Sequence, residues 1–427
     1  MNFKTITNKV NNNKLISDSL WSLLGNVFGR GLALIAGIIV ARFLGKDIYG
    51  EYGAIRNTII TIGIFSTFGL GYTATKFVAE LRVNNKEIIN SFIHRANIIT
   101  IVFSGIMAIL LFSFSNEVSV YIFKGADLQF PLRILSVLIV FNAVTSTQIG
   151  ILSGFGKFKE IAKINTVVGF LTFSFSIFLT YLYSFNGAII ALLIAQILNC
   201  IINYYYVKKE QNTNLINGDI ITYKEILFFS TPIAMQEGTY AISSWISMIL
   251  LINYTSFGQL GMYTVAMQWS SIVLFIPGIL RNVVLSHLSS HTNNENMQNR
   301  IMLQTIFINI LCTIIPAVLV FGFNGFVESS YGHTFKDVGY LITTAVFSTV
   351  FVSVSNVYSQ AYTAQGKNWM MFSLRLFRDT TIILLFLIFV KNKIYDGAFA
   401  LIISNVIISI FFLIFVIYFY KKNRLQI

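Results

Sequence analysis

The chain has little charge and almost no cysteine, histidine or proline. Only 11% of its 427 residues are charged, whereas a soluble globular domain carries about 25%. This deficit excludes a soluble fold, because the chain lacks the polar side chains that would cover a water-facing surface. The only cysteines, Cys200 and Cys312, lie inside apolar runs. They indicate small buried side chains and exclude a disulfide scaffold.

Apolar residues are what the chain has in excess. They make up 55% of the sequence, and the mean hydropathy is +0.72. We therefore expect an all-α integral membrane protein, because a helix satisfies its own backbone hydrogen bonds in lipid. The net charge of +13 does not indicate a nucleic-acid partner, since lysines and arginines mostly flank apolar runs. No metal site or catalytic residue is predicted.

Twelve apolar runs are long enough to cross a bilayer as helices. Several exceed the thickness of the hydrocarbon core and are expected to tilt or to extend beyond it. The predicted spans are 16–43, 52–79, 88–114, 129–154, 159–183, 187–207, 225–252, 261–288, 299–323, 338–364, 369–390 and 397–420.

The positive charges outside the spans are unevenly distributed. Eighteen lysines and arginines lie in the two tails and the even-numbered loops, against seven in the odd-numbered loops. Loops rich in these residues stay in the cytoplasm. We therefore expect both termini to be cytoplasmic.

The two halves of the sequence match each other. Three landmarks recur at a spacing of 210 or 211 residues, and their glycine pairs are Gly50 and Gly261, Gly156 and Gly366, and Gly187 and Gly397. This repeat predicts two six-helix bundles, residues 1–210 and 225–427, joined by a cytoplasmic linker at 211–224. Because six is even, the copies share one orientation, as in transporters with parallel repeats. A V-shaped cleft between the bundles would allow alternating access.

Arg30 is the most informative single residue. It is the only charged residue between Asp18 and Arg42. At 1.5 Å per residue it lies roughly 16 Å into a hydrocarbon core about 30 Å thick. A charge at that depth costs several kcal/mol, so we expect Arg30 to face a wet cavity or a charged partner.

Four more arginines lie inside predicted spans: Arg56, Arg281, Arg375 and Arg378. With Arg30 they would form a ladder of guanidinium groups, which bind phosphate oxygens bidentately. The five are therefore candidate ligands of a diphosphate. In the alternative interpretation, Arg56 and Arg281 extend to the membrane surface, and Arg375 pairs with Asp379 at i,i+4.

Two carboxylates, Glu237 and Asp379, offset these arginines. Either is a candidate coupling group for a proton or a sodium ion, because burial raises the pKa of a carboxyl group that has no cation beside it. The alternative is that Glu237 neutralises one arginine. No other cofactor is predicted.

The segment Ala41–Tyr52, ARFLGKDIYGEY, resembles the AR-x-LG-x-x-x-[YF]-G-x-[YF] signature of polysaccharide flippases. These belong to the multidrug/oligosaccharidyl-lipid/polysaccharide exporter superfamily. Gly69-Leu70-Gly71, followed by Lys76–Glu80, also resembles the second span of that family. One departure is Ser286, near the place where many relatives carry proline.

The resemblance implies an O-antigen-type flippase. Such proteins move undecaprenyl-diphosphate-linked oligosaccharides from the cytoplasmic to the outer leaflet of the bacterial inner membrane without ATP hydrolysis. A polysaccharide polymerase and a chain-length regulator are the implied partners. The related peptidoglycan-precursor flippases place arginines in spans 1, 2 and 8, which by position correspond here to Arg30, Arg56 and Arg281.

Two alternatives make different predictions. A multidrug or cation exporter of the same superfamily would have an acidic lumen, whereas the five arginines and two carboxylates give an intramembrane balance of +3. An O-antigen polymerase or ligase would be an enzyme with a large outer loop that carries a catalytic arginine or histidine. The longest outer loops here, 115–128 and 324–337, are short.

Overall fold

The computed structural model describes residues 14–84, 88–124, 127–211, 221–278, 280, 295–365 and 367–424. Within these ranges some side chains are left out, among them those of 14–28 and of Arg30. Arg281 and Ser286 lie outside the described residues, as does most of the predicted linker.

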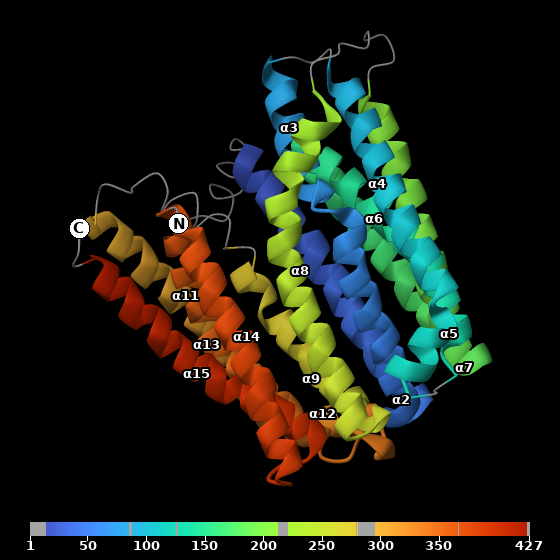
Figure 1. The fold of residues 1–427 in the computed structure, drawn as a ribbon, viewed down its shortest axis with the longest axis vertical. Helices are drawn as coiled ribbons and strands as arrows, with labels where there is room; N and C mark the ends of the chain where they lie inside the picture. Colours follow the sequence, from blue (N-terminus) through green and yellow to red (C-terminus); the bar gives the residue numbers. More distant parts are fainter. Residues whose placement is uncertain are drawn as a thin grey trace, which may run out of the picture. The chain divides into compact units, whose positions relative to one another are not determined.

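The described residues form helices and no strands (Figure 1). The elements are α2 (Lys14–Thr67), α3 (Leu70–Asn84), α4 (Ile89–Ser113), α5 (Ser115–Glu117), η2 (Val118–Ile122), α6 (Gln129–Gly154), α7 (Phe158–Glu210), α8 (Tyr223–Tyr254), α9 (Phe257–Val273), α11 (Glu295–Gly322), α12 (Asn324–Tyr331), η3 (His333–Phe335), α13 (Val338–Ala364), α14 (Asn368–Lys391) and α15 (Gly397–Arg424).

The described residues of every predicted span are mainly helical, although the second span is divided between α2 and α3 and the end of the eighth, from residue 281, lies outside the described residues. The all-α membrane fold is confirmed. Six helices of the described part are apolar and long enough to cross a bilayer by themselves, α7 among them. As one rod, the 53 residues of α7 would measure about 80 Å. The helix instead breaks at Ser184 (φ 51°, ψ −129°), and a Cβ on Gly187 would overlap the carbonyl oxygen of Leu179. The chain therefore turns back on itself there, as the sequence predicts.

Two further breaks lie in the region of the first two spans, one at the end of the first span and one inside the second. Gly45 has φ 71° and ψ 167°, and it ends the first span inside α2. Phe68 and Gly69 have φ of 47° and 69° and separate α2 from α3, about midway along the second span. A positive φ suits glycine, which has no Cβ to clash.

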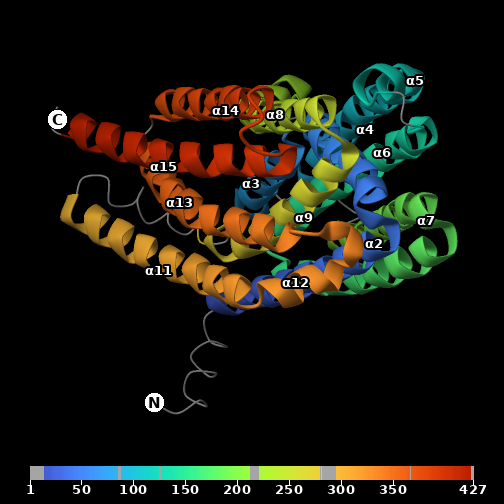
Figure 2. The same ribbon diagram turned by 90° about the horizontal axis from the view of Figure 1, so that it is seen from below.

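The chain divides into two compact units. The first comprises Met1–Phe43 and Ala54–Trp245, and in it α6 packs against α3, α4 and α7. The second comprises Leu44–Gly53 and Ile246–Ile427, and in it α13 packs against α9, α11 and α15 (Figure 2). Helix α8 contributes residues to both units.

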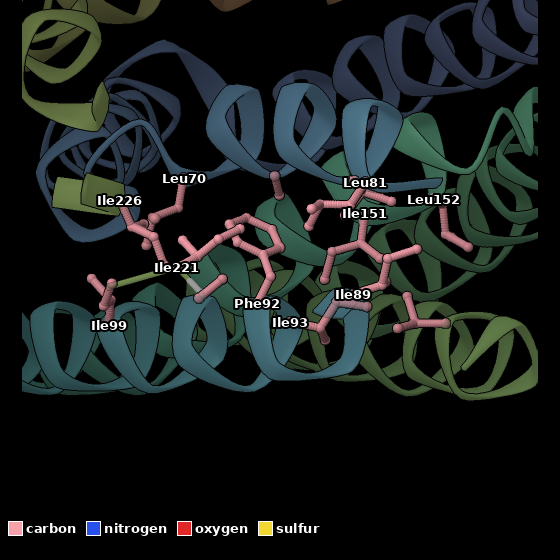
Figure 3. Close-up of a cluster of buried hydrophobic side chains, with 14 of the residues drawn as sticks. Leu70, Leu81, Ile89, Phe92, Ile93, Ile99, Ile151, Leu152, Ile221 and Ile226 are labelled. Atoms are coloured by element: carbon pink, nitrogen blue, oxygen red, sulfur yellow. The ribbon is translucent and has the colours of Figure 1, made fainter. Parts of the chain in front are cut away.

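The hydrophobic core of the first unit includes one face of α3. Leu70, Ala74, Val78 and Leu81 recur at helical spacing and are buried. Figure 3 shows side chains from α3 and α4 pointing toward one another, with Phe92 of α4 fully buried between them. Packing of this kind, rather than exclusion of water, holds helices together in lipid.

The sequence repeat is also visible in the backbone. Lys157 precedes α7 with φ −88° and ψ 49°, and Lys367 precedes α14 with φ −85° and ψ 43°. The N–H of Lys157 donates to Leu152 O at 2.9 Å, and that of Lys367 donates to Tyr362 O at the same distance. The two halves therefore end their fourth helix with the same turn.

In the second unit, equivalent glycines of the two repeats contact each other. A Cβ on Gly50 would overlap the carbonyl oxygen of Phe257, and a Cβ on Gly261 would overlap that of Lys46. Phe257 is the repeat equivalent of Lys46, so the contact is reciprocal. Each added Cβ would also lie 3.1 Å from the backbone nitrogen of the other glycine. Only glycine lets the two backbones approach this closely.

The neighbouring Tyr49 anchors this crossing. Its ring is fully buried, and its hydroxyl donates to Oε1 of Gln268 at 3.2 Å. Its ring centroid lies 6.0 Å from that of Phe335. Phe335 also contacts Tyr331, whose hydroxyl accepts from Trp269 at 2.8 Å. Burial raises the pKa of the Tyr331 phenol, which stays neutral. The YG of the signature is therefore a packing motif.

We expect Gly261→Ala to destabilise the protein by about 1–3 kcal/mol or more, because the new methyl group overlaps a backbone carbonyl that has no flexible side chain to yield. The matched control is Gly105→Ala, whose Cβ would meet nothing within 4 Å. The control should gain up to about 1 kcal/mol from helix propensity. The measurement is the apparent melting temperature of each purified variant at one scan rate. Equal melting of the two variants would contradict the crossing.

Candidate functional site

Helix α8 is attached to the first unit at two points. The indole nitrogen of Trp245 donates to Oγ1 of Thr58 at 3.3 Å, and the hydroxyls of Ser230 and Thr73 lie 2.7 Å apart. Glu237 lies between these points, two turns after Ser230. Residues spaced i,i+7 share a helix face, so Glu237 is held toward the first unit.

The break at Phe68 and Gly69 lies against α8. A Cβ on Gly69 would be 3.1 Å from the side chain of Ile233 and 3.1 Å from the carbonyl oxygen of Ser230. Gly69 therefore meets two demands, a positive φ and close packing. Irregular backbone within a membrane is tolerated where it is buried in protein or lines a cavity.

A cavity of about 500 Å³ opens beside this break, and we call it the α6 cavity. Its α2 and α6 residues recur at helical spacing, so each helix presents one face. The cavity is lined by Ile59, Ile60, Gly63, Ile64, Thr67, Gly69, Gly71, Tyr72, Thr75, Asn142, Ser146, Ile149, Gly150, Ser153 and Glu237. All of them belong to the first unit.

Besides Tyr72 and Ser153, two groups of polar side chains line the α6 cavity. Thr67 and Thr75 donate their hydroxyls to backbone carbonyls. Within the described part of the chain, the side chains of Asn142, Ser146 and Glu237 make no hydrogen bond or ion pair. Their donors and acceptors remain available to a ligand.

The predicted arginines divide between the two units. Arg30 lies in α2, with its side chain outside the described residues. Arg56 is half-buried and continues the α2 stripe that lines the cavity with Ile59 and Gly63. Arg375 of α14 is half-buried. Both Arg375 and Arg56 interact with other groups of the protein. Among the described residues, no arginine lines the α6 cavity.

Arg378 and Asp379 form an ion pair in the second unit. Nε and Nη2 of Arg378 lie 2.8 and 2.7 Å from Oδ1 of Asp379. The guanidinium also lies 5.1 Å from the centre of the Phe412 ring. The side chains are 20% and 11% exposed. Asp379 is therefore engaged by a fixed cation, which leaves Glu237 as the predicted carboxylate that faces a cavity.

The uncharged polar residues of the cavity were not predicted from the sequence. Asn142 and Ser146 are one helical turn apart on α6, so they share a face. The available signal was this spacing inside an apolar span, next to the glycine-rich break at 69–71.

Residues 15–285 match the family model described as "Polysaccharide biosynthesis protein". The chain belongs to this family. The match covers the signature segment, the break at Gly69 and the α6 cavity. The resemblance to polysaccharide flippases is thereby confirmed.

Curated relatives extend over most of the chain. "Capsular polysaccharide biosynthesis protein CapF" of Staphylococcus aureus is 22% identical over 425 residues, which cover 96% of this chain and 100% of that one. The "Putative O-antigen transporter" of Shigella flexneri is 20% identical over 316 residues, which cover 72% and 73%.

Two solved structures show the same fold. An inward-facing multidrug resistance MATE family transporter of the MOP superfamily has a TM-score of 0.77 at 15% identity, covering 95% of this chain and 98% of that one. The lipid II flippase MurJ in an inward closed conformation has a TM-score of 0.75 at 16% identity, covering 94% and 87%. These similarities establish a multi-pass membrane fold of the transporter type.

We expect Asp379→Asn to destabilise the protein, because it leaves the Arg378 charge without its partner. Breaking a buried pair costs about 3–5 kcal/mol, and partial exposure places this pair at the lower end. The double variant Arg378→Gln with Asp379→Asn should recover most of the loss. The measurement is a double-mutant cycle on thermal stability. Additive single effects would show that the two side chains do not stabilise each other.

Proposed function

We propose that this protein is a flippase that moves undecaprenyl-diphosphate-linked oligosaccharides from the cytoplasmic to the outer leaflet of the bacterial inner membrane. The observation that carries the proposal is the family match over residues 15–285. The transporter fold and the named relatives support it. In this proposal both termini are cytoplasmic, and the product passes to a polymerase and a chain-length regulator.

The transported lipid combines three chemistries. Its prenyl chain suits the bilayer, its diphosphate needs counter-charge to leave water, and its sugars need hydrogen-bonding partners. The intramembrane arginines supply the counter-charge in our proposal, with Arg30 at their centre. Alternating access of two helical bundles, 1–210 and 225–427, then carries the head group across without hydrolysing ATP.

A gradient of protons or sodium ions would drive the cycle. Asp379 is bound by Arg378, so Glu237 is the candidate coupling group. It lies at the middle of α8, where a cation that enters the membrane interior would need an oxygen ligand.

A second candidate function is export of cationic compounds. One structural neighbour is named as a multidrug resistance transporter of the MATE family. One observation favours it, namely that the charged residue lining the described α6 cavity is a carboxylate, Glu237. The family match and the polysaccharide relatives favour the flippase. The enzyme alternative has less support, because residues 115–122 and 324–335 of the outer loops fold into short helical turns.

We expect Arg30→Ala to reduce the rate at which newly made glycan reaches the cell surface by about tenfold or more, since a charged hydrogen bond is worth about 1.5–3 kcal/mol. Arg30→Lys should restore the rate only in part, because an ammonium group binds phosphate as a point charge. The measurement is pulse-labelled surface glycan, normalised to the amount of protein in the membrane.

The matched control is Arg300→Ala, which removes an exposed arginine from α11. This control should leave surface glycan unchanged. A normal rate in the Arg30→Ala strain at normal protein level would exclude Arg30 from the transport path.

A further inference from the structure

We propose that the α6 cavity binds the sugar residues next to the diphosphate of the transported lipid. The inference rests on the proposed flippase function and adds a sugar subsite to it. It separates the place that holds the glycan from the arginines that hold the diphosphate.

The size of the cavity fits a sugar better than an ion. Its volume of about 500 Å³ lies in the range of roughly 300–1,000 Å³ that is typical of small-molecule sites. A bare cation instead needs oxygen ligands that converge to about 2.0–2.6 Å. The cavity contributes one carboxylate to an open space, so an ion bound at Glu237 would fill only a small part of it.

The polar groups match hydroxyl groups. Asn142 offers an amide with donors and an acceptor, Ser146 a hydroxyl that does both, and Glu237 a carboxylate that only accepts. A sugar hydroxyl donates one hydrogen bond and accepts others, so it can pair with each of the three. These side chains have no partner among the described residues, and leaving them unpaired in a closed, dry state would be costly.

The walls between these groups are apolar. Ile59, Ile60, Ile64 and Ile149 also line the cavity, and Tyr72 adds an aromatic side chain. A pyranose ring has the same mixed character, with hydroxyls at its edge and C–H groups on its faces. The cavity can therefore dehydrate the ring faces while it pairs the hydroxyls.

The charge of the cavity excludes the diphosphate. Glu237 is the charged residue among the described residues that line it, and a like charge disfavours phosphate. Arg56 continues the same stripe of α2, seven residues before Gly63, and lies about 10 Å from it along the helix axis. Helix α2 thus presents first a cation, Arg56, and then the sugar-sized cavity at Gly63. The lipid carries its diphosphate and its sugars in the same order.

Gly63 provides a direct test of the cavity. A Cβ at this position would lie 3.7 Å from Oδ1 of Asn142, which is ordinary van der Waals contact. Gly63 lines the cavity and its Cβ would meet no backbone atom of another element within 4 Å, so a longer side chain there is expected to take up part of the cavity. Leucine at this helical position also favours the helix, so Gly63→Leu is expected to fold.

The experiment measures the binding of two probes to the purified protein, by ligand-induced shifts in melting temperature. One probe is undecaprenyl diphosphate. The other is the lipid-linked oligosaccharide that accumulates in cells lacking this protein. The wild type should bind the glycosylated lipid at least tenfold more tightly than the bare lipid, because two or more neutral hydrogen bonds are gained. In Gly63→Leu and Asn142→Leu this ratio should fall toward one, with the affinity for the bare lipid unchanged.

The matched control is Gly105→Leu on α4, a position with no neighbour within 4 Å and outside the cavity. It should keep the wild-type ratio. Equal binding of both lipids by the wild type, or an unchanged ratio in Gly63→Leu, would overturn the sugar subsite and leave the flippase function standing. If the wild type binds neither lipid, the flippase function itself fails.

Glu237→Gln separates a sugar from an ion. Glutamine keeps a hydrogen-bonding group of the same shape, so the preference for the glycosylated lipid should weaken by about tenfold or less and persist. A stabilisation by sodium chloride alone that disappears in Glu237→Gln, together with no preference for the glycosylated lipid in the wild type, would identify an ion site instead.

Discussion

The structure depends on one constraint: backbone polar groups within lipid must be paired inside the protein. Helices meet this condition along their length, so the chain can depart from helical geometry only at special places. Among the described breaks, those at Gly45 and Ser184 fall in turns between predicted spans, and the one at Gly69 falls inside a span. Two use glycine at positive φ, and the third is followed by a turn that packs Gly187 on the preceding helix. The break at Gly69 lines the α6 cavity.

Glycine acts in a second way where the repeats meet. Gly50 and Gly261 each clear the space for a carbonyl of the other repeat, and the contact is reciprocal. The duplication therefore does more than double the number of helices, because the crossing needs both Gly50 and Gly261, one from each repeat. Tyr49 and its buried aromatic neighbours fix that crossing. The family signature thus encodes packing, while the residues that line the α6 cavity lie elsewhere in the chain.

The apolar runs of the sequence predict the spans of the described residues, because length and hydropathy dictate membrane helices. The turn before Gly187 and the repeat of glycines at matched spacing can also be predicted from the sequence. The sequence did not indicate that Gly50 and Gly261 touch, since spacing carries no contact information. The i,i+4 spacing indicates Arg375 as a partner of Asp379, but it gives no sign of the ion pair that the adjacent Arg378 forms with the same carboxylate. Asn142 and Ser146 were missed because single uncharged polar residues are common in spans.

In our proposal, the head group of the transported lipid contacts two kinds of surface. Arginines in the spans suit the diphosphate, and the α6 cavity with Asn142, Ser146 and Glu237 suits the sugars. The membrane itself suits the prenyl chain. In this proposal, a protein with only 11% charged residues moves a highly polar head group through lipid by meeting each part of it with a different surface.

Flipping in liposomes tests the central claim most directly. The purified protein is reconstituted with its lipid-linked oligosaccharide, and periodate, which does not cross the membrane, is added outside. Without the protein, about half of the glycan is protected from oxidation inside the vesicles. The account predicts that the protein exposes this protected fraction over time. Protection that stays unchanged in vesicles containing folded protein, with the ion gradient applied in either direction, would contradict it.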